Sequence, residues 1–162
     1  MPSTKKTSID PDSTTVVLRR FRIIFNAVRS NFQQLEKKIG LGGAPVWALS
    51  VIRDNPGIGM GGVAISMDIH QSTASNLVKT LIQRDLISLV KAPDDRRNVQ
   101  LHILPAGRKV LRQVSGPFQG VLPDALTKLR PETLQRLDQD LHELIQLLKA
   151  DEKAGGIPLA EL

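Results

Sequence analysis

Apolar residues recur at three- and four-residue steps over several stretches of the chain, the spacing of one face of an α-helix. The longest stretch runs from residue 14 to residue 39 and stops at the cluster Gly40, Gly42 and Gly43. Ser13 stands at the expected N-cap. The predicted helix is about 39 Å long at 1.5 Å per residue. A globule of 162 residues has difficulty covering a helix of that length, so a partner chain could cover the remaining apolar face.

Shorter helices are expected after this one, separated by glycine and proline residues that interrupt the helical pattern. Their expected spans are 44–54, 62–67, 71–84, 105–114 and from Pro131 to the glycines at 155 and 156. Breaks are expected near 115–117 and again near 120–123. Only a tight turn at 68–70 separates the helices 62–67 and 71–84, so these two predict a helix-turn-helix.

A β-hairpin is predicted directly after the second of these helices. Residues 87–91 and 99–103 alternate between apolar and polar with period two, which is typical of strands. The residues expected to face inward are Ile87, Leu89, Val99, Leu101 and Ile103. A seven-residue tip, 92–98, joins the strands. The predicted fold is mainly α with a small β-hairpin wing, a winged helix-turn-helix.

The helix 71–84 has a polar face without acids. Its apolar stripe is Ala74, Leu77, Val78, Leu81 and Ile82, and no Asp or Glu occurs from residue 69 to residue 84. Amides pair with adenine edges, and Lys79 suits a guanine or a phosphate. The candidate DNA contacts are Gln71, Ser72, Thr73, Ser75, Asn76 and Lys79. An ordinary solvated helix face is the alternative, and the hairpin that follows favours DNA reading.

The hairpin tip carries a second group of candidate residues. Asp95 is expected to brace an arginine, and Arg97, next to Arg96, is expected to enter a narrow minor groove. An ordinary charged loop is the alternative.

Other chemistry is weakly represented. Gly57-x-Gly59-x-x-Gly62 matches a dinucleotide-binding motif in letters, but that motif needs a preceding strand, and a helix is expected there. The chain has no Cys, and its three His residues lack metal-ligand spacing. His70 stands at the start of the helix 71–84, where it could touch a phosphate. We expect no catalytic activity, no cofactor and no metal.

The net charge of +6 is unevenly distributed. Residues 70–112 hold eight Lys and Arg against three Asp and Glu, a net +5, whereas residues 121–162 hold five against eight, a net −3. A polyanion is the partner that the first region favours. No uncharged run reaches 18 residues and the N-terminus lacks a secretory pattern, so a cytoplasmic protein without membrane contact is expected.

The region from residue 60 to residue 112 resembles the MarR-type winged helix-turn-helix transcriptional regulators. The wing Asp95-Arg96-Arg97, followed by a strand and then Pro105-Ala106-Gly107, carries most of the resemblance. Other matching segments are Val63-Ala64, Ile69 to Leu77, and Leu81 with Asp85-Leu86-Ile87. The departures are Asp68 for the usual turn glycine, His70 for a small capping residue, Asn76 for a common arginine and Leu104 for a capping threonine.

The resemblance implies a homodimer that binds double-stranded DNA at a pseudo-palindromic operator, most often as a repressor. The expected regions are a loose arm (1–12), an N-terminal dimerisation helix (13–40), the winged module (44–104), C-terminal dimerisation helices (105–150) and a loose tail (151–162). The candidate dimer contacts are Phe21, Phe25, Phe32, Leu137, Leu141 and Leu144. The resemblance also allows a small aromatic or anionic effector beside Trp47, although Trp47 could equally be a core residue. Two functions compete with DNA reading: a protein-interaction module without DNA binding, and an enzyme that uses the glycine loop.

Overall fold

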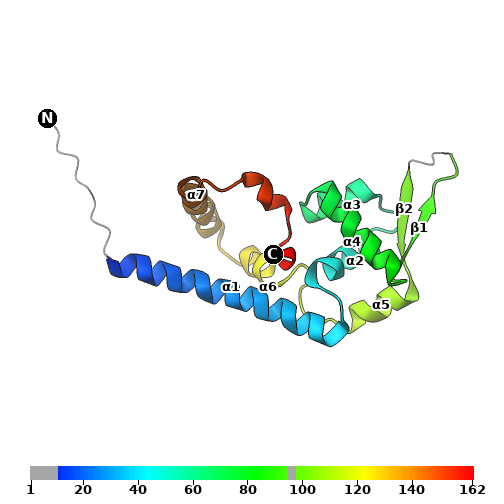
Figure 1. Ribbon diagram of the computed structural model, residues 1–162, viewed down its shortest axis with the longest axis horizontal. Helices are drawn as coiled ribbons and strands as arrows, with labels where there is room; N and C mark the ends of the chain where they lie inside the picture. Colours follow the sequence, from blue (N-terminus) through cyan, green and yellow to red (C-terminus); the bar gives the residue numbers. More distant parts are fainter. Residues whose placement is uncertain (1–10, 95–97) are drawn as a thin grey trace.

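The computed structural model describes residues 11–94 and 98–162 and is mainly helical (Figure 1). Its elements in chain order are α1 (Pro11–Ile39), α2 (Gly43–Asp54), α3 (Met60–Met67), α4 (Gln71–Gln83), β1 (Ile87–Lys91), β2 (Val99–Ile103), α5 (Pro105–Arg112), α6 (Val121–Thr127), α7 (Pro131–Leu148), and the 3₁₀ helices η1 (Glu152–Gly156) and η2 (Leu159–Glu161). The predicted fold class, mainly α with one hairpin, is confirmed.

A winged module is formed by α2, α3, α4 and the antiparallel pair β1–β2, which lie together at one end of the molecule (Figure 1). The strands pair from Ile87 opposite Ile103 to Lys91 opposite Val99. The module contains most of the buried apolar side chains. The largest fully buried ones are Leu49, Ile52, Met67, Leu81, Leu101, Val46, Val63 and Val78. Burial of these side chains is the main source of stability of the module and fixes how α4 is presented.

The glycine segment before α3 is attached to the wing. The amide of Gly57 donates to the carbonyl of Leu101 at 2.9 Å, and the amide of Leu101 donates to the carbonyl of Ile58 at 2.9 Å. Ile58 thereby forms a bridge beside β2. We expected a loop up to residue 62, but α3 already begins at Met60. Because the helix α2 precedes this segment and no strand does, the dinucleotide-binding hypothesis lacks the context it needs.

The long helix α1 extends away from the module along one side of the molecule (Figure 1). It ends at Ile39 as predicted but begins at Pro11, so Ser13 lies inside the helix and the expected cap at Ser13 is wrong. Residues 1–10 of the expected arm lie outside the described residues, and residues 11 and 12 are already helical. Of the described residues of α1, only Val28 is buried, whereas the Phe25 side chain is 62% exposed. The apolar face of α1 is therefore largely uncovered within this chain.

The C-terminal region differs most from expectation. The helix α7 ends at Leu148 because Lys149 adopts a left-handed conformation with φ of 51°. The segment 151–162, expected to be a loose tail, contains η1 and η2 and returns to the module, where Pro158 is buried (Figure 1). The structure also contains α6, a helix that the sequence analysis did not predict. Its first turn contains Pro123, within the second of the two predicted breaks. No residue of α7 is buried, so its apolar stripe is also largely uncovered.

Candidate nucleic-acid interface

The turn between α3 and α4 holds the two helices in a helix-turn-helix. Asp68 occupies the left-handed region with φ of 52°, a position at which glycine is usual and Asp is tolerated. Its amide donates to the carbonyl of Ile65 at 3.2 Å, and the amide of Ile69 donates to Ala64 at 3.0 Å. These bonds end α3 and orient the start of α4. The departure at Asp68 thus leaves the geometry of the turn intact.

The helix α4 separates its residues by face as the sequence predicts. Ala74, Leu77, Val78 and Leu81 are buried, while Ile82 is half-buried. Among the candidate DNA contacts, four are exposed (Gln71, Ser72, Asn76 and Lys79) and two are half-buried (Thr73 and Ser75). The side chains of the four exposed residues form no hydrogen bond or ion pair with another residue in the described part of the chain. Their donors and acceptors are free to meet an outside partner.

Electrostatics at α4 favour an anion. No acid occurs within the helix, and the amide groups of its first turn carry the positive end of the helix dipole. His70 occupies the N-cap position without a side-chain cap. Its ring atom Nε2 instead donates to the carbonyl of Lys153 at 2.7 Å. A phosphate near this end would therefore meet backbone amides of α4, while Nε2 of His70 is engaged within the chain.

The wing is described as far as its stem. The amide of Ala92 donates to the carbonyl of Asn98 at 2.9 Å and closes the hairpin beyond the strands. Asp95, Arg96 and Arg97, the expected brace and readers, lie outside the described residues. Leu89 was expected to face inward, and it pairs with Leu101, but it is 38% exposed. It lies farther along the wing than Ile87, which is 2% exposed and still reaches the core.

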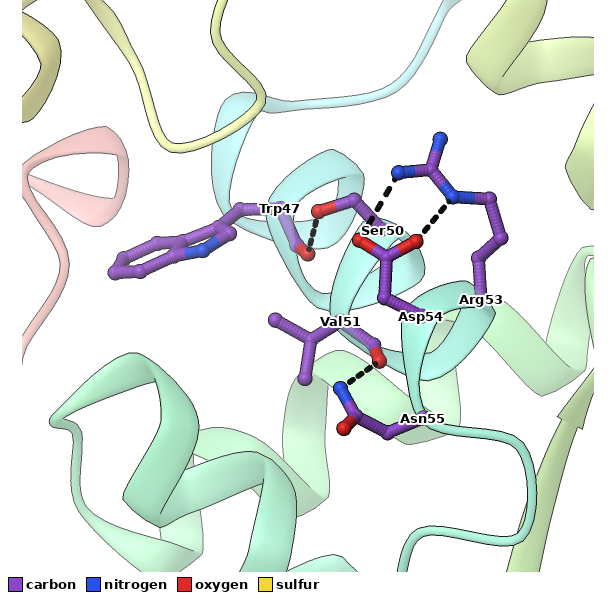
Figure 2. A network of polar contacts seen from close by, with 6 residues as sticks. All are labelled: Trp47, Ser50, Val51, Arg53, Asp54 and Asn55. Atoms are coloured by element: carbon purple, nitrogen blue, oxygen red, sulfur yellow. Dashed lines mark hydrogen bonds and ion pairs between the residues drawn. The ribbon is translucent and has the colours of Figure 1, made fainter.

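A second basic surface lies away from α4, where α2 and α5 enclose a hollow lined by Arg53, Arg108 and Arg112. Figure 2 shows Arg53 paired with Asp54, the two N–O distances being 2.7 and 3.0 Å. The Arg53 guanidinium also stacks 4.8 Å from the ring centre of Phe118. The hydrogen bond from Arg53 lowers the pKa of Asp54, and the pKa of Arg53 is raised by the same bond. Arg53 is thus held by its own chain.

Trp47 lies where the winged module meets the flanking helices. It is half-buried and lines a cavity of about 260 Å³ between α1, α2, α3 and the C-terminal segment. Figure 2 shows the indole directed away from the Arg53–Asp54 pair, toward the red ribbon of that segment. The residues that line the cavity include Phe32, Met67, Ile157, Pro158 and Leu159. A cavity with mainly apolar walls is therefore present beside Trp47.

The candidate dimer contacts fall into two groups. Phe21 and Phe25 stack on each other with ring centres 6.1 Å apart, and Leu144 lines a groove beside them. Phe32, in contrast, packs inside the chain, where a methyl group added at Gly43 would stand 2.4 Å from its Cδ1. Leu137, Leu141 and Leu144 are half-buried. Phe32 therefore has an intrachain role that its place in the helical stripe did not reveal.

The described residues, 11–94 and 98–162, contain neither a cluster of metal ligands nor a membrane-spanning helix. No three acidic or histidine side chains within these ranges are close enough to hold a metal ion. No helix there is long and apolar enough to cross a membrane.

A model described as the MarR family matches residues 39–98, from the end of α1 to the wing. The winged module of this chain is therefore similar to that of the MarR family. A Thauera aromatica protein named as a transcriptional regulator for an hcr operon is 35% identical over 66 residues, 41% of this chain and 40% of its own length. The Bacillus subtilis (strain 168) protein YsmB, an uncharacterized HTH-type transcriptional regulator by name, is 28% identical over 90 residues, 56% of this chain and 62% of its own. The matches thus span about half the length of these relatives.

Solved structures share the fold of this chain beyond the winged module. FabT of Streptococcus pneumoniae, crystallised in complex with DNA, superposes with a TM-score of 0.55 at 18% identity over 85% of this chain and 97% of FabT. BpsR of Bordetella bronchiseptica superposes with a TM-score of 0.53 at 24% identity over 93% of this chain and all of BpsR. The order of flanking helices around the winged module is therefore shared with these two solved structures.

Proposed function

We propose that this protein is a MarR-type regulator that binds double-stranded DNA in a sequence-dependent way, regulates transcription in the cytoplasm and has no catalytic role. One observation carries the proposal: the exposed face of α4 offers amide, hydroxyl and ammonium groups without acids and without partners in the described part of the chain. Such groups match base edges in the major groove and phosphates beside it. The relatives named as transcriptional regulators and the DNA complex of FabT support the proposal.

The proposed binding unit is a homodimer. The helices α1 and α7 leave large apolar side chains exposed, among them Phe25 at 62% and Leu148 at 67%. The aromatic groups at Phe21 and Phe25 border an apolar groove that also contains Leu144 and Leu148. A second copy of the chain would remove this surface from water. Two-fold symmetry would then place the two α4 helices about 34 Å apart, on a pseudo-palindromic site.

We further propose that the protein represses transcription when it is bound to DNA, and that a small effector relieves this repression. The cavity beside Trp47 has apolar walls and room for a molecule of fragment size, smaller than a typical drug site. The DNA binding of BpsR is regulated by 6-hydroxynicotinic acid, a small aromatic acid. We propose a small aromatic or anionic effector at this cavity.

The test begins with selection of bound duplexes from random DNA, followed by affinity measurements on the selected site at several salt concentrations. We expect the logarithm of the affinity to fall linearly with the logarithm of salt, because Lys and Arg contacts release counterions. Arg97→Ala should weaken binding at least tenfold, about 1.4 kcal/mol, while the melting temperature stays near that of the wild type.

A protein-interaction module without DNA binding is the competing function. Absent binding to every duplex, or binding that does not change with salt, would favour it. Wild-type affinity in Arg97→Ala would show that the wing takes no part in binding.

A further inference from the structure

The C-terminal segment, residues 151–160, is an ordered connection between α7 and the winged module (Figure 1). The side chain of Asp151 accepts a hydrogen bond from the amide of Lys153 at 3.0 Å and caps η1. The side chain of Gln146, in α7, donates to the carboxylate of Glu152 at 3.1 Å. One end of the segment is thus fixed to the helix from which it leaves.

The other end of the segment is fixed to the start of α4 through His70. The backbone amide of His70 donates to the carbonyl of Gly156 at 3.0 Å, and its ring atom Nε2 donates to the carbonyl of Lys153 at 2.7 Å. The contact is close as well as polar. A methyl group added at Gly156 would stand 2.6 Å from both Cε1 and Nε2 of the ring. The segment therefore touches the helix-turn-helix at the N-cap of its DNA-reading helix.

Both ends of α4 are consequently held by parts of the chain outside the module. At the C-terminal end, the guanidinium of Arg84 donates to the carbonyl of Gly40, just after α1. Gly40 has φ of +68°, a conformation that glycine adopts without strain. Because the backbone of glycine is permissive, the covalent connection at Gly40 alone does little to fix the orientation of the winged module relative to α1. At the N-terminal end, the contacts of His70 supply the connection to α7.

We propose that residues 151–160 position the DNA-reading helix, with His70 as the residue through which they act. The segment sets where the N-terminal end of α4 lies relative to α1 and α7, the helices proposed to form the dimer. An operator with half-sites one DNA turn apart requires both α4 helices at a fixed separation, so a shift at one His70 is repeated by symmetry at the other. The role in DNA affinity rests on the proposed function, whereas the contact itself does not.

The molecule contains its own reporter for this contact. Trp47 is the single tryptophan of the chain, and the cavity that it lines has Ile157, Pro158 and Leu159 as part of its wall. Displacement of the segment would expose the indole to water and shift its fluorescence emission to longer wavelength. This readout requires no DNA.

The experiment compares two alanine substitutions at adjacent glycines, neither of which has a positive φ. Gly156→Ala places a methyl group against the His70 ring, whereas at Gly155 an added Cβ meets no atom within 4 Å. We expect Gly156→Ala to shift the Trp47 emission and to weaken binding to the selected duplex roughly fivefold, as loss of one hydrogen-bonded contact would. Gly155→Ala should match the wild type in both measurements, and the melting temperature of each variant verifies folding.

A double-mutant cycle tests whether the effect passes through His70. In the His70→Ala background the ring is absent, so Gly156→Ala should cost no further affinity and produce no further emission shift. Equal losses in both backgrounds would overturn the role of His70. An emission shift in Gly156→Ala with unchanged or tighter DNA binding would overturn the positioning role.

Failure of the proposed function gives a different pattern from failure of this inference. If the proposed function is wrong, even the wild type will bind no duplex, and the segment 151–160 can have no role in DNA affinity. The Trp47 differences between Gly156→Ala and Gly155→Ala, together with faster hydrogen exchange at the first amides of α4 in Gly156→Ala, would still establish the contact.

Discussion

Single residues in this protein are constrained most where the backbone of one element approaches another. Gly107, in the first turn of α5, is buried, and an added Cβ would lie 2.4 Å from the carbonyl oxygen of Leu86 and 2.9 Å from Cγ1 of Ile103. The clash with Leu86 involves backbone, so no side-chain rotation relieves it. The Pro-Ala-Gly sequence after the wing therefore has a packing reason at its third position.

Gly107→Ala should lower the free energy of unfolding by about 1 to 3 kcal/mol, the range for overpacked cores. Gly61→Ala is the matched control, because Gly61 lies in the helix α3 and an added Cβ meets nothing within 4 Å. That change should leave stability unaltered or raise it by up to about 1 kcal/mol through the unfolded state. Urea unfolding of both variants measures the difference. Equal stability of the two would contradict the close approach of α5 to Leu86.

At the scale of elements, α4 owes its place to its buried stripe and its proposed chemistry to the opposite face. Asn76 and Lys79 lie one turn apart on that exposed face. Gln83, at the end of the same helix, is exposed too, but it lies about 18 Å along the axis from the N-terminus. Residues near the N-terminal end reach base edges in helix-turn-helix proteins. Position along α4 should thus decide which polar residues matter.

Asn76→Ala should reduce the affinity for the selected site by about 1 to 3 kcal/mol and relax base preference at one position. Lys79→Ala should weaken binding to all sequences alike if it contacts a phosphate, and reduce the salt slope by about one. Gln83→Ala should bind like the wild type. Fluorescence anisotropy with the selected duplex and single-base variants makes these comparisons. A loss in Gln83→Ala equal to that in Asn76→Ala would show that α4 enters the groove differently.

The whole molecule is divided into a winged module with a closed core and a helical region whose apolar face remains open. The buried apolar side chains lie almost entirely in the module, and the described part of α1 adds Val28 alone. A helix of 29 residues with exposed Phe25, Ile23 and Val17 is an unusual surface for a monomer in water. The arrangement is consistent with a second chain that completes the helical region.

Phe25→Asp should shift the wild-type dimer toward monomer in sedimentation at micromolar concentration, because it places a charge in the apolar face that a second copy would bury. Ile65→Asp is the control for an equal change of charge at an exposed apolar residue, since Ile65 is 84% exposed on α3 within the module. That variant should remain dimeric. A monomeric wild type would remove the basis of the dimer proposal.

Much of this fold was predictable because its signals are local. The 3.6-residue repeat gave the buried stripe of α4, and the period of two gave both strands with their observed bounds. The exposed polar face of α4 followed from the same pattern, since burial of one stripe exposes the other. The bridge between Ile58 and Leu101 was not predictable. Ile58 is a single apolar residue between two glycines, and one residue cannot show the alternation that indicates a strand. The wing tip at residues 95–97 stays a prediction from sequence.

The sequence by itself determined the winged module, the acid-free polar face of α4 and the family resemblance, because these depend on side-chain type at regular spacing. The tertiary structure alone decided the course of residues 151–160 and their contact with His70. The acceptors of that contact are the backbone carbonyls of Lys153 and Gly156. Every residue type has a backbone carbonyl, so no pattern of residue types predicts these hydrogen bonds. The same holds for Gly107 and Phe32, whose close neighbours are distant in sequence and come together only when the core closes.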